Sequence, residues 1–347
     1  MTCRLAVAAT AGLLVFLAAG ARAEQGARPS VTPAPFDSLP LAQAKQTPVV
    51  RSLRVQGNVW MINAGSVNVA AQIGAQGVLL VDSGTEAAAD AILAEVRRLA
   101  GDKPIRYIVN THAHRDHTGG NVTIAAAGKS VISGNFAAQA GPGAANAAKI
   151  LAHEQTQILM LAPGPLGVAD AGRPTDTFFV EKDAFYFNDE AVELLHQPDA
   201  HTSGDIIVYF RKSDVIAAGD VYINTTFPVI DREHGGGYAG ILAALNRIID
   251  ITVPRDKEEG GTYVIPGHGR LADEADVVDY RDMATIVRDR VRDAISRKMS
   301  LEQVKAARLV RDYEGRFGAS QGPWTTDAFI EAAYRSLSPA RAAAGPR

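Results

Sequence analysis

The most constraining feature of this sequence is a run of three histidines and one aspartate within six residues. His112, His114, Asp116 and His117 directly follow an apolar run, 105–109, that reads as a strand. Their spacing differs from the i, i+4 pair that places two ligands on one helix face, so we expect a loop at the end of the strand. Four donors in such a loop can face one small volume. The stretch therefore predicts a metal site.

Three further candidate ligands follow later in the chain. They are His201, Asp220 and His268, each close to a β-like run and to a glycine that allows close backbone approach. Seven potential ligands are enough for two metal ions. Imidazole and carboxylate without thiolate favour zinc, with iron or manganese as alternatives.

This ordered set resembles the metallo-β-lactamase superfamily, whose H-x-H-x-D-H motif is followed by His, Asp and His in that order. The resemblance covers roughly residues 50–285. It implies that Asp116 and Asp220 take part in catalysis as well as in metal binding. It also implies one zinc on His112, His114 and His201, a second on Asp116, His117 and His268, and Asp220 as the bridge between them.

Other residues are expected to support the ligands or to contact a substrate. Asp82 lies in a Val-Asp-Ser-Gly turn, and in the superfamily this aspartate supports the metal loop; simple turn chemistry is the alternative. Asp205, four residues after His201, is expected to support the ligands as well. The candidate substrate contacts are His153, Arg232 and His234.

The apolar periodicity predicts a mixed α/β chain. A meander of short antiparallel strands spans 49–81, a helix spans 86–99, and a second β-rich half spans 177–218. Alanine-rich residues 137–160 have a helical pattern, and 224–237 is glycine-rich and expected to rim the pocket. The resemblance implies a more specific architecture, a four-layer αββα sandwich with the metals at one edge.

The two ends of the chain have different compositions. Residues 1–23 read as a signal peptide ending in Ala21-Arg22-Ala23, with an uncleaved membrane anchor as the alternative. Residues 24–48 form a flexible lead-in, 49–285 the catalytic domain and 286–347 a C-terminal helical extension. Within that extension, Ser300-Leu301-Glu302-Gln303 is a capping-box sequence that opens a helix. We expect the mature protein to be periplasmic or secreted.

Charge and cysteine content restrict the partners. The formal net charge is −3, and loss of Arg4 and Arg22 with the leader makes it −5, so nucleic-acid binding is not expected. The single cysteine, Cys3, lies in the leader, which excludes zinc–thiolate chemistry in the mature protein. The expected partner is a small-molecule substrate, with no membrane association after cleavage.

The expected activity is hydrolysis of an ester, lactone, thioester or amide, including a β-lactam, by a hydroxide held between two zinc ions. One alternative is a β-lactamase proper, although Asp220 stands where zinc lactamases have cysteine or serine. A second alternative is an iron-dependent oxidoreductase on the same fold. A catalytically inert binding protein is disfavoured because no ligand is missing.

Overall fold

Tight glycine turns fold the start of the chain back and forth. The computed structural model describes residues 49–130, 146–257 and 260–339. Gly57 and Gly65 have φ angles of 56° and 81° at the first two strand connections. The strands of this half are β1 (Val50–Gln56), β2 (Val59–Ala64), β3 (Val67–Gly74), β4 (Gly77–Val81), β5 (Ile105–Val109), β6 (Lys149–His153) and β7 (Asp176–Phe178).

The first four strands form the predicted antiparallel meander. The next three pair in parallel in the order β4, β5, β6, β7, so their carboxyl ends lie at one edge. The connections on this half contain η1 (Glu86–Ala88), α1 (Ala89–Ala100), α2 (Arg115–Thr118), α3 (Asn121–Ala126), α6 (Glu154–Leu161) and η2 (Asp170–Gly172).

The second half repeats the pattern of strands followed by a helix. Its strands β8 to β11 are antiparallel neighbours, and β12 pairs in parallel with β11. The two halves join where Val67 of β3 pairs with His268 of β12. The elements are β8 (Lys182–Phe187), β9 (Glu190–His196), β10 (Ile206–Phe210), β11 (Val215–Ile223), η3 (Arg232–His234), α7 (Tyr238–Ile251), β12 (Tyr263–His268) and β13 (Ala272–Asp273).

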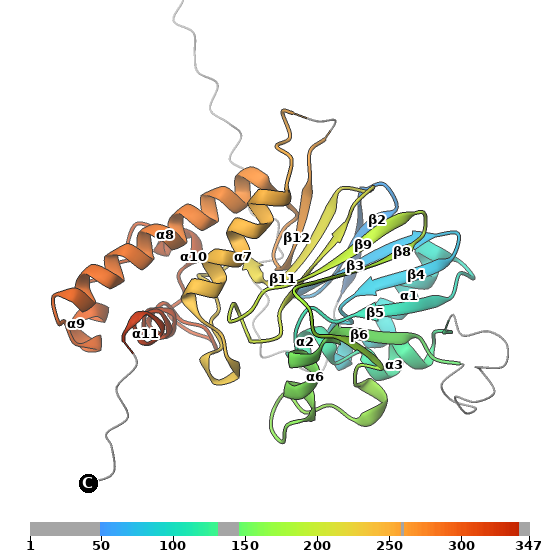
Figure 1. Cartoon of the computed structure of the whole chain (residues 1–347), viewed down its shortest axis with the longest axis horizontal. Coiled ribbons are helices and arrows are strands. Elements are labelled where there is room, and N and C mark those ends of the chain that lie inside the picture. The colour runs from blue at the N-terminus through green and yellow to red at the C-terminus, as the bar shows by residue number, and fades with distance from the viewer. Residues whose placement is uncertain (1–48, 131–145, 258–259, 340–347) are drawn as a thin grey trace, which may run out of the picture. The chain divides into compact units, whose positions relative to one another are not determined.

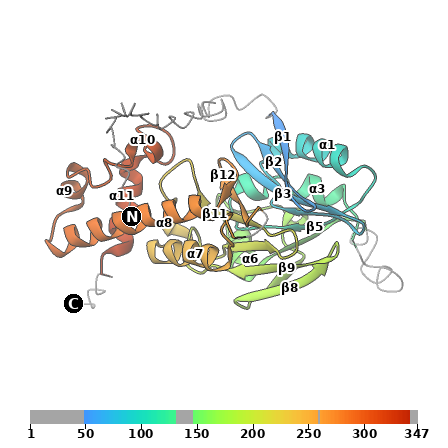
Figure 2. The ribbon, with the colours of Figure 1, turned by 90° about the horizontal axis from the view of Figure 1, so that it is seen from above.

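The two halves pack face to face, which confirms the predicted αββα sandwich. Alternate residues of each strand point to opposite faces: Leu79 enters the core shared by both halves, whereas Leu80 packs on the α1 side. Helices α1 and α3 cover the first half and α7 the second (Figures 1 and 2). The shared core contains Met61, Leu79, Val109, Leu194, Val208 and Ala217.

The C-terminal helices follow the second half, and the first of them, α8, lies beside α7 in both views (Figures 1 and 2). They are α8 (Glu274–Ser296), α9 (Leu301–Ala306), α10 (Glu314–Phe317) and α11 (Thr326–Leu337). The predicted capping box at Ser300 is present, because its side chain accepts from Gln303 N–H and Gln303 reaches back to Ser300 N–H. The expected boundary between residues 285 and 286 falls inside α8, and one hydrophobic cluster joins α7 to α8 and α11.

One predicted helix was partly wrong. Within the alanine-rich stretch 137–160, residues 149–153 form β6, and the helix α6 begins only at Glu154. His153 is therefore the last residue of a strand and the N-cap of α6. The leader, the lead-in and residues 131–145 lie outside the described residues. No helix in the described ranges has the length and apolarity needed to cross a bilayer.

Candidate metal centre

The histidine motif lies where β5 ends at the carboxyl edge of the sheet. After Val109 the chain runs as an irregular segment through His112, and His114 is the N-cap of the one-turn helix α2. Asp116 and His117 therefore lie in the first turn of α2. The expected loop is correct for the first two histidines, whereas the adjacent Asp-His pair is helical.

Glycines let the later strands approach this motif closely. A Cβ atom on Gly267 would lie 1.9 Å from Asp220 Oδ1, and one on Gly219 would lie 2.7 Å from Thr111 Cβ. Gly219 also has a φ of 54°, a conformation that disfavours side chains. Asp220 can therefore sit directly beside the motif only because its neighbours lack side chains.

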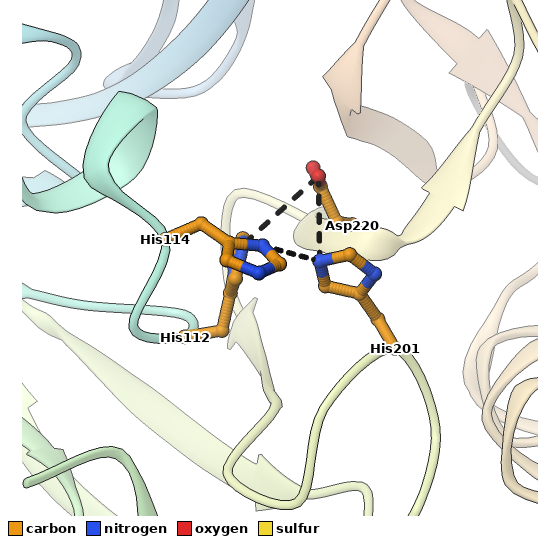
Figure 3. Close-up of side chains that lie close together, drawn as sticks. All are labelled: His112, His114, His201 and Asp220. Atoms are coloured by element: carbon orange, nitrogen blue, oxygen red, sulfur yellow. Dashed lines mark hydrogen bonds and ion pairs between the residues drawn. The ribbon is translucent and has the colours of Figure 1, made fainter. Parts of the chain in front are cut away.

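The first group of candidate ligands surrounds Asp220 (Figure 3). His114 Nδ1 lies 2.7 Å from His201 Nε2. Asp220 Oδ2 lies 3.7 Å from His201 Nε2 and 3.9 Å from His112 Nε2. Two histidines from the segment between β5 and α2 and one from the β9–β10 loop thus face one carboxylate.

The second group lies on the other side of Asp220. His117 Nε2 and His268 Nε2 are 3.3 Å apart, and His268 Nε2 is 3.3 Å from Asp116 Oδ2. Asp220 Oδ1 lies 3.1 Å from His117 Nε2, and Asp220 Oδ2 lies 3.3 Å from His268 Nε2. Asp220 is therefore within reach of both groups, in the place that the resemblance implies for a bridging ligand.

Hydrogen bonds behind three of the histidines fix which ring nitrogen faces the centre. His117 Nδ1–H donates to Asp82 Oδ2 at 2.8 Å, and His201 Nδ1–H donates to Val229 O at 2.9 Å. His268 Nδ1–H donates to Ser66 O at 2.7 Å. Each bond leaves the Nε2 lone pair free. All three Nε2 atoms point inward.

The other two histidines are held in the same way. Thr111 Oγ1–H donates to Asp82 Oδ2 at 2.8 Å, so this hydroxyl accepts from His112 Nδ1–H at 3.0 Å. His114 Nε2–H donates to Asp231 Oδ2 at 2.8 Å, which leaves Nδ1 free. Four Nε2 atoms and one Nδ1 atom therefore present lone pairs to the centre.

Buried atoms without partners fit bound cations. Among the described residues, His112 Nε2 and Asp220 Oδ1 are buried and form no hydrogen bond. Such groups cost free energy unless something pairs with them. Two cations, one in each group, would satisfy the converging nitrogen and oxygen atoms, so the donor set fits metal ions of the zinc type.

Electrostatics separate the two groups. Burial lowers the pKa of His112 well below its usual value and that of His201 to about 4, so both rings are neutral. Burial also opposes protonation of His268, yet the carboxylates of Asp220 and Asp116 raise its pKa to about 10. The carboxylates therefore favour a proton on His268 in the second group. A metal ion bound there would take the place of that proton.

The remaining predicted residues lie in different places. Asp205 is buried and accepts from Thr202 N–H at 2.7 Å and Thr202 Oγ1–H at 2.8 Å, directly beside His201. His234 lies next to the centre, with Nδ1 2.5 Å from Asp231 Oδ2. Asp205 therefore shapes the loop that carries His201.

The two other candidate substrate contacts are separate from this cluster. His153 is only 3% exposed, and its ring stacks on His196 at 3.6 Å. No described hydrogen bond or ion pair joins His153 to a candidate ligand. Arg232 is exposed, and among the described residues no hydrogen bond or ion pair joins its side chain to a candidate ligand.

Sequence reasoning missed Asp231 and Thr111, which hold His114 and His112. Thr111 adjoins the motif, so its position alone could have identified it. Asp231 lies 117 residues after His114. The available signal was its place in the glycine-rich stretch 224–237, beside Arg232 and His234.

Comparison with known proteins agrees with this geometry. A family model described as the metallo-beta-lactamase superfamily matches residues 55–268, which include all seven candidate ligands. No curated protein sequence matches the chain.

Two solved structures show the same fold. A metallo-beta-lactamase from Pontibacter korlensis is 16% identical, with 68% of this chain and 99% of that chain covered and a TM-score of 0.50. The stereoselective inverting sec-alkylsulfatase Pisa1 from Pseudomonas sp. is 15% identical, with a TM-score of 0.59. That match covers 83% of this chain and 50% of the sulfatase, so the chain spans half of the sulfatase's length. The chain belongs to the metallo-beta-lactamase superfamily.

Proposed function

We propose that this protein is an exported, binuclear zinc-dependent hydrolase that attacks a carbonyl-type bond in a small molecule. One observation carries the proposal: five imidazole lone pairs and the carboxylate of Asp220 converge, and hydrogen bonds hold every ring from behind. Such pre-arranged donors are typical of catalytic metal sites. The donor set of the proposed first zinc is His112 Nε2, His114 Nδ1 and His201 Nε2, and that of the second is Asp116, His117 Nε2 and His268 Nε2, with Asp220 between them.

Exposure indicates the side from which a substrate approaches. The side chains of His112, His117 and His201 are at most 1% exposed, whereas that of Asp116 is 38% exposed. His114 and His268 are partly exposed as well. A substrate therefore reaches the centre from the side of Asp116.

The residues of the chain would hold the metal ions and orient the substrate, while the metal ions would supply the chemistry. Bound zinc would polarise the scissile carbonyl and lower the pKa of a bound water toward about 7. Asp220 would hold the two positions at a fixed spacing. Asp116 lies on the open side of the centre, where it can contact the incoming substrate and accept a proton during hydrolysis.

Metal removal tests this proposal. We expect the purified protein to hold about two zinc equivalents, because seven donors exceed the four that one tetrahedral ion takes. Chelation should abolish hydrolysis and added zinc should restore it, measured with nitrocefin, a lactone, a thioester, a phosphodiester and a secondary alkyl sulfate. Stoichiometric iron without zinc would contradict the proposal and favour the oxidoreductase alternative. Activity on nitrocefin alone would favour a β-lactamase proper.

Export is tested by N-terminal sequencing. The leader ends in small residues at Ala21 and Ala23, so cleavage should leave Glu24 as the first residue of a periplasmic or secreted protein. The acidic net charge supports a small-molecule substrate and argues against a nucleic-acid partner. A cytosolic protein that retains Met1 would contradict the proposed location.

A further inference from the structure

Residues 224–237 form the loop between β11 and α7, here named the Asp231 loop. This loop contacts the candidate metal centre and also the C-terminal helices. On the metal side, Val229 O accepts from His201 Nδ1–H at 2.9 Å, and Asp231 Oδ2 accepts from His114 Nε2–H at 2.8 Å. Asp231 N–H also donates to His201 O at 2.9 Å. This one loop therefore orients two of the three histidines of the first metal position.

The other side of the Asp231 loop rests on the C-terminal helices. The Phe227 ring stacks on Phe329 of α11 at a centroid distance of 4.7 Å and an interplanar angle of 1°. Phe227 N–H donates to Phe317 O, which ends α10, at 3.2 Å. Tyr280 of α8 donates its hydroxyl to Thr226 O at 2.9 Å. Three C-terminal helices thus hold the beginning of the loop.

The end of the loop is held by the same helices. Tyr238, the first residue of α7, donates its N–H to Ser336 Oγ of α11 at 2.9 Å. The Tyr238 hydroxyl donates to Ala284 O of α8, also at 2.9 Å. Phe227 and Tyr238 are both buried, at 1% and 0% exposure. The loop is therefore fixed at both ends, while its middle carries Val229 and Asp231.

The imidazole rings of the second metal position are held by residues outside this loop, which contacts the position through a backbone bond from Asn224 N–H to His268 O at 3.4 Å. Asp82, just after β4, holds His117, and Ser66, in the β2–β3 turn, holds His268. These bonds lie on the first half of the sandwich. Weakening the C-terminal helices should consequently affect the two positions unequally.

We propose that the C-terminal helices α8, α10 and α11 brace the first metal position by fixing the Asp231 loop, and so set its metal affinity separately from that of the second. This inference rests on the proposed metal centre, and it assigns a role to the C-terminal extension. Partners that orient metal ligands typically change metal affinity by about 10- to 100-fold when removed. Phe329 is the positioning residue whose ring stacks on Phe227 of the loop.

A double-substitution experiment isolates each position in the full-length protein. Asp116→Ala removes a ligand of the second position, and His112→Ala removes one of the first. Phe329→Leu is then added to each background, and zinc affinity is measured with a competing chelator. We expect affinity to fall about tenfold or more in the Asp116→Ala background and to stay unchanged in the His112→Ala background. Equal losses in both backgrounds, or no loss in either, would overturn the proposal.

Controls separate bracing from general destabilisation. Val304 of α9 is fully buried in the same hydrophobic cluster, and no described hydrogen bond or ring contact joins it to the Asp231 loop. Val304→Ala should lower the melting temperature and leave both zinc affinities unchanged; a matching loss at the first position would overturn the brace. If Phe329→Leu does not fold, Tyr280→Phe combined with Ser336→Ala removes the hydrogen bond to Thr226 in the loop and the one to Tyr238 directly after it. This pair should likewise lower zinc affinity in the Asp116→Ala background alone.

The same measurements distinguish the brace from the proposed function. Wild-type protein that binds two zinc ions without hydrolysing any of these substrates would refute the proposed hydrolase activity. The affinity measurements would then still decide whether the C-terminal helices brace the first metal position. Zinc-dependent hydrolysis combined with equal losses in the two backgrounds would refute the brace alone. Wild-type protein that binds no zinc would refute both.

Discussion

Asp220→Ala should abolish tight binding of one metal and lower turnover by about a thousandfold or more, which corresponds to about 4 kcal/mol. The carboxylate lies 3.1 Å from His117 Nε2 and 3.7 Å from His201 Nε2, so it contacts both candidate positions. Despite burial, which favours the neutral acid, nearby His268 and His117 hold its pKa well below the usual range. The anion would offset the repulsion between two cations. Zinc content and kcat measure both effects.

Asp220→Asn separates charge from shape. The amide keeps the volume between the two groups but loses the negative charge, so the second metal should bind more weakly although the fold is intact. A purely structural role would instead lower the melting temperature and leave two zinc ions per chain. Folded Asp220→Ala protein with two tightly bound metals and full activity would contradict the bridging role.

Asp82→Asn should lower activity by about 10- to 100-fold while costing little stability. Asp82 accepts from Thr111 N–H, Thr111 Oγ1–H and His117 Nδ1–H, each at 2.8 Å. An amide NH₂ facing His117 Nδ1 would favour the ring tautomer with its proton on Nε2. That proton would occupy the lone pair offered to the metal. Asparagine also tolerates the φ of 66° at this position.

Asp214→Asn is a matched control for Asp82→Asn. Asp214 likewise has a positive φ, of 51°, and accepts from the hydroxyls of Tyr209 and Thr262 at 2.9 and 2.8 Å. Its substitution should reduce the melting temperature and leave zinc binding unchanged. If Asp82→Asn behaved in the same way, Asp82 would be a turn residue and would not support the metal loop.

The sequence predicts the fold well where local pattern and tertiary structure agree. Glycine turns and alternating apolar residues predicted the meander of β1 to β4, and capping chemistry predicted the start of α9 at Ser300. The predicted helix at residues 149–153 was wrong because their alanine-rich context favours helix, whereas pairing with β5 and β7 makes them a strand. Single-residue propensity cannot represent such pairing partners.

The candidate site likewise combines residues that the local sequence predicts with residues that only the folded structure brings together. The motif around His112 was visible because its spacing is local, and the family resemblance supplied the order of the later ligands. Asp231 was missed because only the folded loop brings it 2.8 Å from His114 Nε2. The role of the C-terminal helices was also hidden, since contacts such as that of Phe227 with Phe329 link distant segments.

A crystal structure of the zinc-soaked full-length mature protein, with anomalous diffraction on both sides of the zinc absorption edge, tests the central claim most directly. Two anomalous peaks are expected. One should lie at His112 Nε2, His114 Nδ1 and His201 Nε2, and the other at Asp116, His117 Nε2 and His268 Nε2, with Asp220 contacting both. A single peak, or peaks bound by other residues, would contradict the binuclear centre.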